Sequence, residues 1–324
     1  MKKIFLCLLS LLVLCGCSKY NKDSIKKDLN NSMKKVNGYY IVGNLDVYNG
    51  DNNYKYKVES SYYKGNYKVD LLNLNNNHEQ IILRNNDGVY VLNPSLNKSY
   101  KFQSNWPDNN SQIYFIDSLL NDINLDDDFK LVKNKDGYII ECKLAYSNNK
   151  NLVNEKIYLD KNLNIKKIEV YDDNKNIQMK FVINSIDKKA VFDNNYFDVS
   201  ENLKTEETEE TMKEIDDTIY PMYLPSGTYL SSEESVNKED GERVILTFAG
   251  ETPFIMVQET VNNTKEVMSV TGDPEFITDT IGAIGDNSIE FISNGIEYYI
   301  SSENMTSNEM MQVAESLSPV AVMK

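Results

Sequence analysis

The feature that most limits the fold is a series of β-strand patterns with short breaks in the first third of the chain. Six segments are rich in Tyr, Val and Ile and have the length of strands: 39–48, 54–63, 67–74, 79–84, 89–92 and 98–103. The breaks hold turn-forming residues, such as Asn49-Gly50-Asp51 and Asn86-Asp87-Gly88. Because connections this short join antiparallel neighbours, the sequence predicts a meandering antiparallel sheet.

Two amphipathic helices and further strand patterns extend this first part. An apolar stripe at helical spacing runs through residues 22–37, and a second one runs through residues 112–123. Strand patterns resume at 130–132, 138–146, 154–159, 165–171 and 177–186. About eleven antiparallel strands with two helices predict a mainly β (α+β) fold, in which a strongly curved sheet or incomplete barrel carries a helical lid on its concave side.

The chain changes character near residue 200. Residues 1–200 carry 28 basic and 24 acidic side chains, whereas residues 201–324 carry 6 and 25, so the acidity of a chain with net charge −15 belongs to one end. The acidic segment at 201–218 has the composition of a solvated linker. We therefore expect two domains, at 17–200 and at 219–324.

The second domain is predicted to be a small, acidic α+β unit. Its strand patterns lie at 227–231, 243–248, 254–259, 289–292 and 296–301. Thr306-Ser307-Asn308-Glu309 has the pattern of a capping box, which indicates the start of a final helix. Met310, Val313, Ala314 and Leu317 are expected on the apolar face of that helix.

The first residues have the pattern of a bacterial signal peptide. Two lysines precede an apolar run at 4–13, which is too short to cross a bilayer core of about 30 Å. Leu14-Cys15-Gly16-Cys17 then resembles a lipobox, so residues 1–16 are expected to be removed and Cys17 to carry a diacylglyceryl group and an acyl chain such as palmitate. We expect a lipid anchor on the extracytoplasmic face of the cell membrane. An ordinary secretory signal, or an anchoring helix that is never cut, is the alternative.

No set of residues indicates catalysis, a metal or a cofactor. The one histidine, His78, lies in an Asn-rich turn, so no catalytic triad can be assembled around it. The sequence lacks clustered zinc ligands and a Gly-rich phosphate loop, and Asp126-Asp127-Asp128 lacks the ligand spacing of a calcium loop. Cys142 alternates with Ile140 and Leu144, which indicates a buried strand residue. We expect no enzyme, and the net negative charge argues against nucleic-acid binding.

Aromatic residues gather around the stretch that leads into the second helix. They are Tyr90, Tyr100, Phe102, Trp106, Tyr114 and Phe115. Such side chains offer a large apolar area with polar tips, which suits a core, a ligand groove or a partner surface. Because a curved sheet has a concave apolar face to fill, we expect these residues either to pack there or to form a groove or partner surface.

Residues 80–107 resemble the sporulation lipoproteins of the YdcC and GerS type. These belong to the LolA-like superfamily, which also holds the periplasmic outer membrane lipoprotein carriers and the RseB regulators. The likeness extends to the lipobox, to Asn105-Trp106-Pro107, to the turn at 239–243 and to the ending at 310–317. The resemblance implies a LolA-like incomplete antiparallel barrel with helices on its concave side. It also implies a non-enzymatic role in spore formation or germination.

The resemblance further implies a protein partner. GerS-type proteins bind a cortex-modifying N-acetylmuramoyl-L-alanine amidase, although this chain differs from them by its added acidic C-terminal domain. Our leading hypothesis is a membrane-tethered protein that binds and supports an envelope or cortex-modifying partner, with the outer forespore membrane as one location. Two alternatives stay open: a carrier-like protein that binds a hydrophobic ligand, a lipid or acyl group, and an RseB-like regulator of an anti-sigma factor. The regulator hypothesis predicts a basic partner for the acidic domain and a salt-sensitive association.

Overall fold

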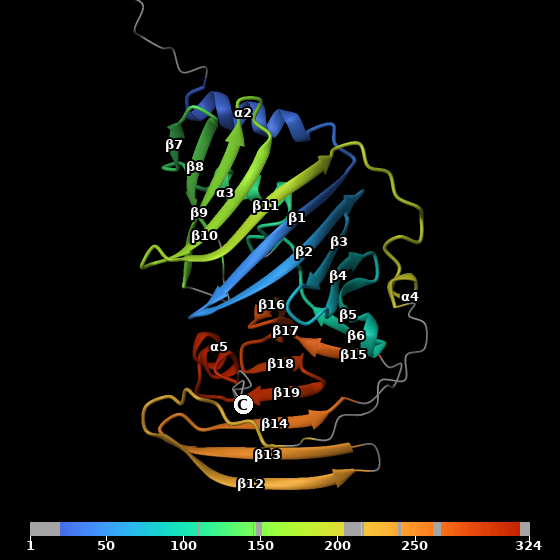
Figure 1. Ribbon diagram of the computed structural model, residues 1–324, viewed down its shortest axis with the longest axis vertical. Helices are drawn as coiled ribbons and strands as arrows, with labels where there is room; N and C mark the ends of the chain where they lie inside the picture. Colours follow the sequence, from blue (N-terminus) through green and yellow to red (C-terminus); the bar gives the residue numbers. More distant parts are fainter. Residues whose placement is uncertain are drawn as a thin grey trace, which may run out of the picture.

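A computed structural model describes residues 20–108, 110–144, 146, 151–203, 215, 217–238, 241–261 and 267–317. Within these residues the chain forms two β-sheets, which lie one above the other in Figure 1. The signal peptide, Cys17 and the centre of the acidic linker lie outside the described residues. Among the described residues, no helix combines the length and the apolar character that crossing a bilayer requires.

The first sheet is an open, almost entirely antiparallel sheet of twelve strands, in the order β15-β6-β5-β4-β3-β2-β1-β11-β10-β9-β8-β7. Its strands are β1 (Gly38–Asn49), β2 (Asn52–Tyr63), β3 (Asn66–Asn73), β4 (Glu79–Asn85), β5 (Gly88–Asn93), β6 (Lys98–Gln103), β7 (Lys130–Lys133), β8 (Gly137–Lys143), β9 (Leu152–Asp160), β10 (Ile165–Asp172), β11 (Ile177–Asp187) and β15 (Val267–Thr271). Only β15 runs parallel to its neighbour, β6. Because β15 and β7 form two edges, the barrel is incomplete, as the strand patterns predicted.

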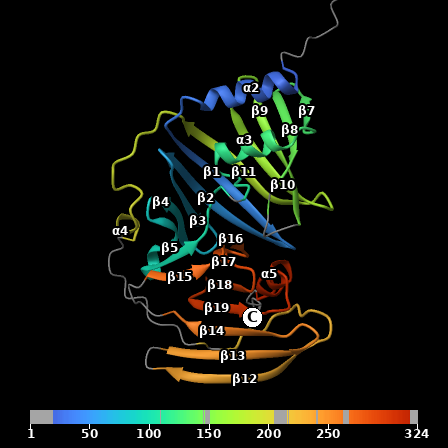
Figure 2. The ribbon, with the colours of Figure 1, turned by 180° about the vertical axis from the view of Figure 1, so that it is seen from behind.

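Two helices fill the concave side of this sheet. α2 (Lys22–Met33) buries Ile25 and Leu29, and α3 (Ile116–Leu125) lies in front of β8–β10 in Figure 2. α3 begins later than the predicted 112–123 because the preceding residues bind the sheet and the helix side chains instead. Ser60 Oγ donates to the Tyr114 carbonyl at 2.7 Å, and the Gln112 N–H donates to Ser118 Oγ at 2.6 Å. A 3₁₀ turn, η2 (Pro94–Leu96), links β5 to β6.

The second sheet has seven antiparallel strands in the order β12-β13-β14-β19-β18-β17-β16. They are β12 (Thr228–Lys238), β13 (Gly241–Gly250), β14 (Phe254–Thr260), β16 (Asp273–Ile277), β17 (Thr280–Ile284), β18 (Ser288–Ser293) and β19 (Ile296–Ser301). α5 (Ser307–Glu315) packs against one face through Met310, Val313 and Ala314. Its capping box is formed as predicted, since the Glu309 N–H donates to Thr306 Oγ1 at 3.2 Å and the Thr306 N–H donates to Glu309 Oε2 at 2.9 Å.

The two sheets meet where β16 and β17 approach the first sheet. The patterns of residues 267–284 did not indicate β15, β16 or β17, and every residue of β17 is buried. A strand that is buried on both faces shows no alternation of apolar and polar residues. β15 follows the predicted linker but adds to the first sheet, so the strand order does not separate at residue 200. The division into domains at 17–200 and 219–324 therefore stays a proposal.

A segment on the opposite, convex side of the first sheet positions the candidate site. Residues 188–203, which include α4 (Val199–Asn202), run from the end of β11 along the outside of the sheet (Figure 1). Phe197 packs there in a separate apolar cluster with Ile81, Leu83, Tyr90 and Leu92 of β4 and β5. The Asn85 side chain donates to the Phe197 carbonyl at 2.9 Å. The two sheets, and the helices on the concave side of the first, confirm the predicted mainly β (α+β) fold.

Candidate functional site

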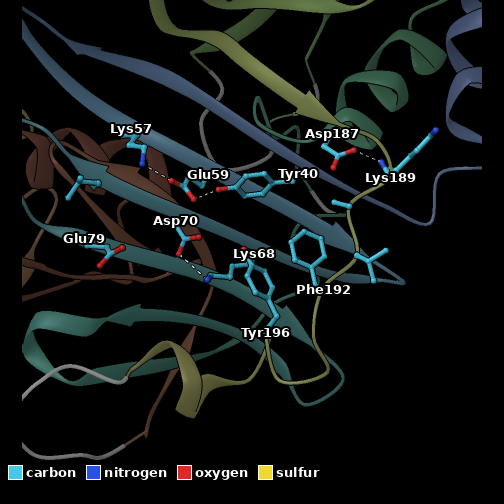
Figure 3. A pocket seen from close by; sticks show the side chains of 13 residues that line it. Tyr40, Lys57, Glu59, Lys68, Asp70, Glu79, Asp187, Lys189, Phe192 and Tyr196 are labelled. Carbon is cyan, nitrogen blue, oxygen red and sulfur yellow. Dashed lines mark hydrogen bonds and ion pairs between the residues drawn. The ribbon is translucent and has the colours of Figure 1, made fainter.

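A cavity of about 680 Å³ lies between the convex face of the first sheet and the segment that follows β11. Figure 3 shows its floor, made by β1, β2 and β3, and its wall, made by residues 187–196. The lining side chains belong to Tyr40, Lys57, Glu59, Lys68, Asp70, Leu72, Glu79, Asp187, Lys189, Ala190, Val191, Phe192 and Tyr196. The volume lies within the range of about 300 to 1,000 Å³ that small-ligand pockets occupy.

The floor alternates in charge because neighbouring strands place residues of the same face side by side. Glu59 of β2 lies opposite Asp70 of β3, and Lys57 and Lys68 flank them on the same face. Lys57 Nζ donates to Glu59 Oε1 at 2.6 Å, and Lys68 Nζ lies 3.3 Å from Asp70 Oδ1. The Tyr40 hydroxyl also donates to Glu59. Each acid of this central pair therefore has its own cationic partner.

The two central acids respond differently to these surroundings. Hydrogen bonds from Lys57 and Tyr40 hold the pKa of Glu59 below its ordinary value. Burial raises the pKa of Asp70 to about 6, although the charge of Lys68 acts in the opposite direction. Glu59 is thus charged at neutral pH, whereas the charge of Asp70 changes in the weakly acidic range.

The wall of the cavity is aromatic. The rings of Phe192 and Tyr196 pack with centroids 4.5 Å apart, and Lys68 Nζ lies 4.4 Å from the centroid of the Tyr196 ring. The hydroxyl groups of Tyr196 and Ser61 form a hydrogen bond of 3.0 Å. Burial raises the pKa of Tyr196 to about 12, so this hydroxyl stays protonated at neutral pH. The wall therefore offers ring faces above a charged floor.

This arrangement is suited to binding a charged ligand or protein segment. The polar part of the lining consists of lysines, carboxylates and tyrosines. Its lysines and carboxylates, with rings on one side, match a ligand or a protein segment that carries both charges and apolar groups. Among the described residues, no group of three or more His, Cys, Asp and Glu side chains has an arrangement that holds a metal ion.

The six aromatic residues singled out in the sequence lie in the core. Tyr90, Tyr100, Phe102, Trp106, Tyr114 and Phe115 are each at most 7% exposed. Trp106, Tyr114 and Phe115 pack against the concave side, with Trp106 and Phe115 ring centroids 5.5 Å apart. Tyr100 instead faces the second sheet, where its hydroxyl donates to Glu297 Oε1 at 2.7 Å. A groove or partner surface made by these side chains would need exposed area that they lack in this structure.

A group of buried acids lies among these concave-side residues. Ser111 Oγ donates to Asp122 Oδ1 at 2.8 Å, and Asn110 Nδ2 donates to Glu275 Oε1 at 3.0 Å. Burial raises the pKa of Asp122 to about 6 and that of Glu275 to about 8, and it raises the pKa of Glu155 well above its ordinary value. These acids are therefore protonated in the folded protein at a pH where exposed acids are charged.

The remaining residues considered from the sequence, Cys142, Asp126 and His78, lie in a strand or in turns. Cys142 is buried in β8, as predicted, and its Sγ lies 3.3 Å from Glu155 Oε1. Asp126 accepts the N–H groups of Asp128 and Lys143, each at 3.0 Å, so it stabilises a turn. His78 lies in the turn between β3 and β4. The lipidation of Cys17 stays a prediction, because this residue lies outside the described residues.

Sequence reasoning missed the cavity on the convex face. In the sequence, Lys57, Glu59, Lys68 and Asp70 look like ordinary solvent-facing positions of two strands. One signal was present: three aromatic residues, Phe192, Tyr196 and Phe197, follow the last strand pattern of the first part within a polar segment. Aromatic side chains at such spacing indicate that the segment packs back onto the sheet rather than leaving it.

Comparison with known proteins finds a matching family and a relative in sequence. The family described as sporulation protein YdcC-like matches residues 1–197 of this chain. The sporulation protein YdcC of Bacillus subtilis (strain 168) is 33% identical over 318 residues, which cover 96% of this chain and 94% of that protein.

Solved structures are matched at lower identity. MucB in the complex structure of Pseudomonas aeruginosa MucA/MucB is similar with 12% identity and a TM-score of 0.33, over 91% of this chain and 98% of that chain. The structure of the CwlD amidase from Clostridioides difficile in complex with the GerS lipoprotein matches with 19% identity and a TM-score of 0.28, over 54% of this chain and 96% of that chain. On the family match and the identity to the Bacillus protein, the chain belongs to the YdcC-like family of sporulation proteins.

Proposed function

We propose that this protein is a lipid-anchored, non-catalytic sporulation protein that binds and supports an envelope or cortex-modifying protein. In this proposal Cys17 carries the anchor and holds the folded part on the extracytoplasmic face of the cell membrane, with the outer forespore membrane as one location. The partner proposed first is an N-acetylmuramoyl-L-alanine amidase, as the resemblance to GerS-type proteins implies.

The contrast between the two faces of the first sheet carries the proposal. On the concave face, large side chains such as Trp106, Phe115 and Ile25 are essentially inaccessible to solvent. On the convex face, the cavity lined by Lys57, Glu59 and their neighbours is open to solvent and charged. A carrier of lipids needs an apolar cavity, whereas paired charges beside aromatic rings suit a partner surface that carries complementary charges and apolar side chains. The structure therefore favours a protein partner over the lipid-carrier alternative.

Charge pairs at the cavity fit a supporting role. Lys57 pairs with Glu59, and Lys68 pairs with Asp70, so the floor presents a fixed pattern of charges. A partner with the complementary pattern gains orientation and selectivity. Phe192 and Tyr196 supply the apolar contact area beside these charges. Binding that stabilises an enzyme in this way needs no reaction in the binding protein itself.

The test is affinity capture of the tagged full-length chain from sporulating cells. The variant Lys189→Glu reverses an exposed charge in the cavity, and Lys161→Glu makes the same change in the turn between β9 and β10, outside the cavity. The unaltered chain and Lys161→Glu should retain an envelope enzyme, while Lys189→Glu should retain roughly fivefold less of it. Capture of no envelope protein by the unaltered chain, together with a normal cortex in a deletion strain, would overturn the proposal.

A further inference from the structure

The second sheet has a long free edge at β12. On one side β12 pairs with β13 from Thr228 to Lys238, and on its other side no strand among the described residues is paired with it. It is the lowest strand in Figure 1, and every residue of it after Thr228 is exposed. The main-chain N–H and C=O groups along such an edge are a ready template for one more strand.

The middle of this edge lacks most of the usual protection. Natural sheets block their edges with bulges, proline or charged side chains, lysine above all, and acidic side chains repel a further acidic strand but not a basic one. β12 has a bulge between Leu230 and Ser232, and Lys238 at its end is bound to Glu259. Residues 232–237 between these points, Ser-Glu-Glu-Ser-Val-Asn, contain neither proline nor lysine. A continuous stretch of this length is enough for a short strand to pair.

The charges along this stretch define what can pair with it. Glu233 faces the side of the sheet that carries α5, where it accepts hydrogen bonds from Tyr220 at 2.7 Å and Thr218 at 3.0 Å. Glu234 faces the other side, next to Val236, which is 46% exposed. The edge therefore presents acids on both faces with an apolar side chain beside one of them. Residues 201–324 as a whole carry 25 acidic and 6 basic side chains.

We infer that β12 accepts an extended basic segment of a protein partner, which adds to the second sheet as an eighth strand beside residues 232–237. Lysine or arginine side chains of that segment lie beside Glu233 and Glu234, and an apolar side chain covers Val236. A second copy of this chain is a poorer occupant, since two β12 strands would bring their glutamates together. The inference rests on the proposed function for the existence of a protein partner, but it uses a different surface.

The experiment measures peptide binding to the full-length chain by fluorescence anisotropy. The probe is the synthetic peptide Thr-Val-Thr-Lys-Lys-Thr, whose adjacent lysines point to opposite faces of a strand, as Glu233 and Glu234 do, and whose valine lies opposite Val236 in antiparallel pairing. The second probe is the same peptide with N-methyl groups on alternate residues. Glu234→Lys alters the edge, while Glu303→Lys makes the same charge change at an exposed position before α5. We expect roughly fivefold to tenfold weaker binding for Glu234→Lys and a small change for Glu303→Lys. The N-methylated peptide should not bind measurably, because it cannot donate the main-chain hydrogen bonds.

Three results would overturn the inference. Equal binding of the two peptides would mean a general charge attraction without strand pairing. Equal weakening in Glu234→Lys and Glu303→Lys would mean that the edge is not the site, and a dimer that forms through β12 would mean that a second copy occupies it. If Glu234→Lys captures the cellular partner as well as the unaltered chain does, the edge proposal fails while the proposed function stands.

Discussion

The side-chain amide of Gln80 in β4 pairs with the main chain of Ile281 in β17 as a neighbouring strand would. Gln80 Nε2 donates to the Ile281 carbonyl at 3.2 Å, and Gln80 Oε1 accepts from the Ile281 N–H at 2.7 Å. Thr280 Oγ1 donates to the same oxygen at 3.0 Å. Because Gln80 is only 3% exposed, one side chain satisfies main-chain groups that are buried between the two sheets.

Replacing Gln80 should therefore weaken the junction between the sheets. Gln80→Ala leaves both main-chain groups of Ile281 without this partner, and we expect the free energy of unfolding to fall by about 2 to 3 kcal/mol. Urea denaturation of the full chain measures this change. Gln103→Ala, at an exposed glutamine at the end of β6, is the matched control and should change little. Equal effects of the two changes would contradict the role given to Gln80.

Buried acids should make the protein more stable at weakly acidic than at alkaline pH. Burial raises the pKa of Glu275 to about 8 in the folded chain, whereas an unfolded glutamate has a pKa of about 4.3. The contribution of protonated Glu275 to the free energy of unfolding is complete below the pKa of an unfolded glutamate. It is lost as the pH rises through the pKa of Glu275 in the folded chain. Asp122, with a pKa raised to about 6, acts in the same direction. Unfolding curves at pH 5 and pH 8.5 should show the loss.

The variant Glu275→Gln tests the assignment of this pH dependence. Glutamine keeps the oxygen that accepts from Asn110 Nδ2 but has no proton to lose. The dependence of stability on pH between 5 and 8 should become shallower by as much as about 1.4 kcal/mol per pH unit. Glu59 has a lowered pKa, so its contribution is lost only at more acidic pH and does not overlap this range. An unchanged slope in the variant would show that Glu275 is not the titrating group.

Trp106 provides an optical test of the filled concave side. It is the only tryptophan of the chain, and its side chain is 0% exposed. Its fluorescence should be poorly quenched by acrylamide in the folded protein and strongly quenched in urea. Trp106→Ala should also lower the free energy of unfolding by about 3 to 5 kcal/mol, because it leaves a cavity in the core. Strong quenching in the folded protein would favour the alternative in which these aromatic residues line an open groove.

Most strands of the first sheet are predictable from the sequence because one face is buried and the other is more exposed, with β4 and β5, which are buried on both faces, as the exceptions. β1 buries Tyr39, Ile41, Gly43 and Leu45, and the alternate residues between them are less buried, so alternation marks the strand. β17 is buried on both faces between the sheets and shows no alternation. Its existence depends on contacts with distant residues such as Gln80, which no local pattern reports.

The cavity was not predictable for a related reason. Lys57 and Asp70 come from different strands, and their proximity depends on the register of β2 and β3. The wall forms only because residues 188–203 return across the sheet after β11, and Phe197 drives that return by packing on β4 and β5. The sequence shows the aromatic residues of this segment but not the surface on which they pack.

The capping box of α5 gives a local test of the second part of the chain. Thr306→Ala removes the oxygen that accepts from the Glu309 N–H, and we expect a loss of about 1 kcal/mol in the free energy of unfolding. Thr306→Ser keeps that oxygen and should retain most of the stability. Thermal unfolding of the two variants beside the unaltered chain checks the difference, and equal losses would mean that the hydrogen bond is not responsible.

The segment that forms the wall of the cavity should open when its apolar contact is removed. Phe197 is 5% exposed, and Phe197→Ala should cost about 3 kcal/mol or more, because it removes the buried apolar contact between residues 188–203 and the sheet. Trypsin should therefore cut faster after Lys188 and Lys189 than in the unaltered chain. Val191→Ala, at a position that is 78% exposed, is the control for a nearby change without lost packing. Equal cleavage of the two variants would show that Phe197 does not hold the segment, and the partner capture described for Lys189→Glu should fall with Phe197→Ala if the wall belongs to the binding site.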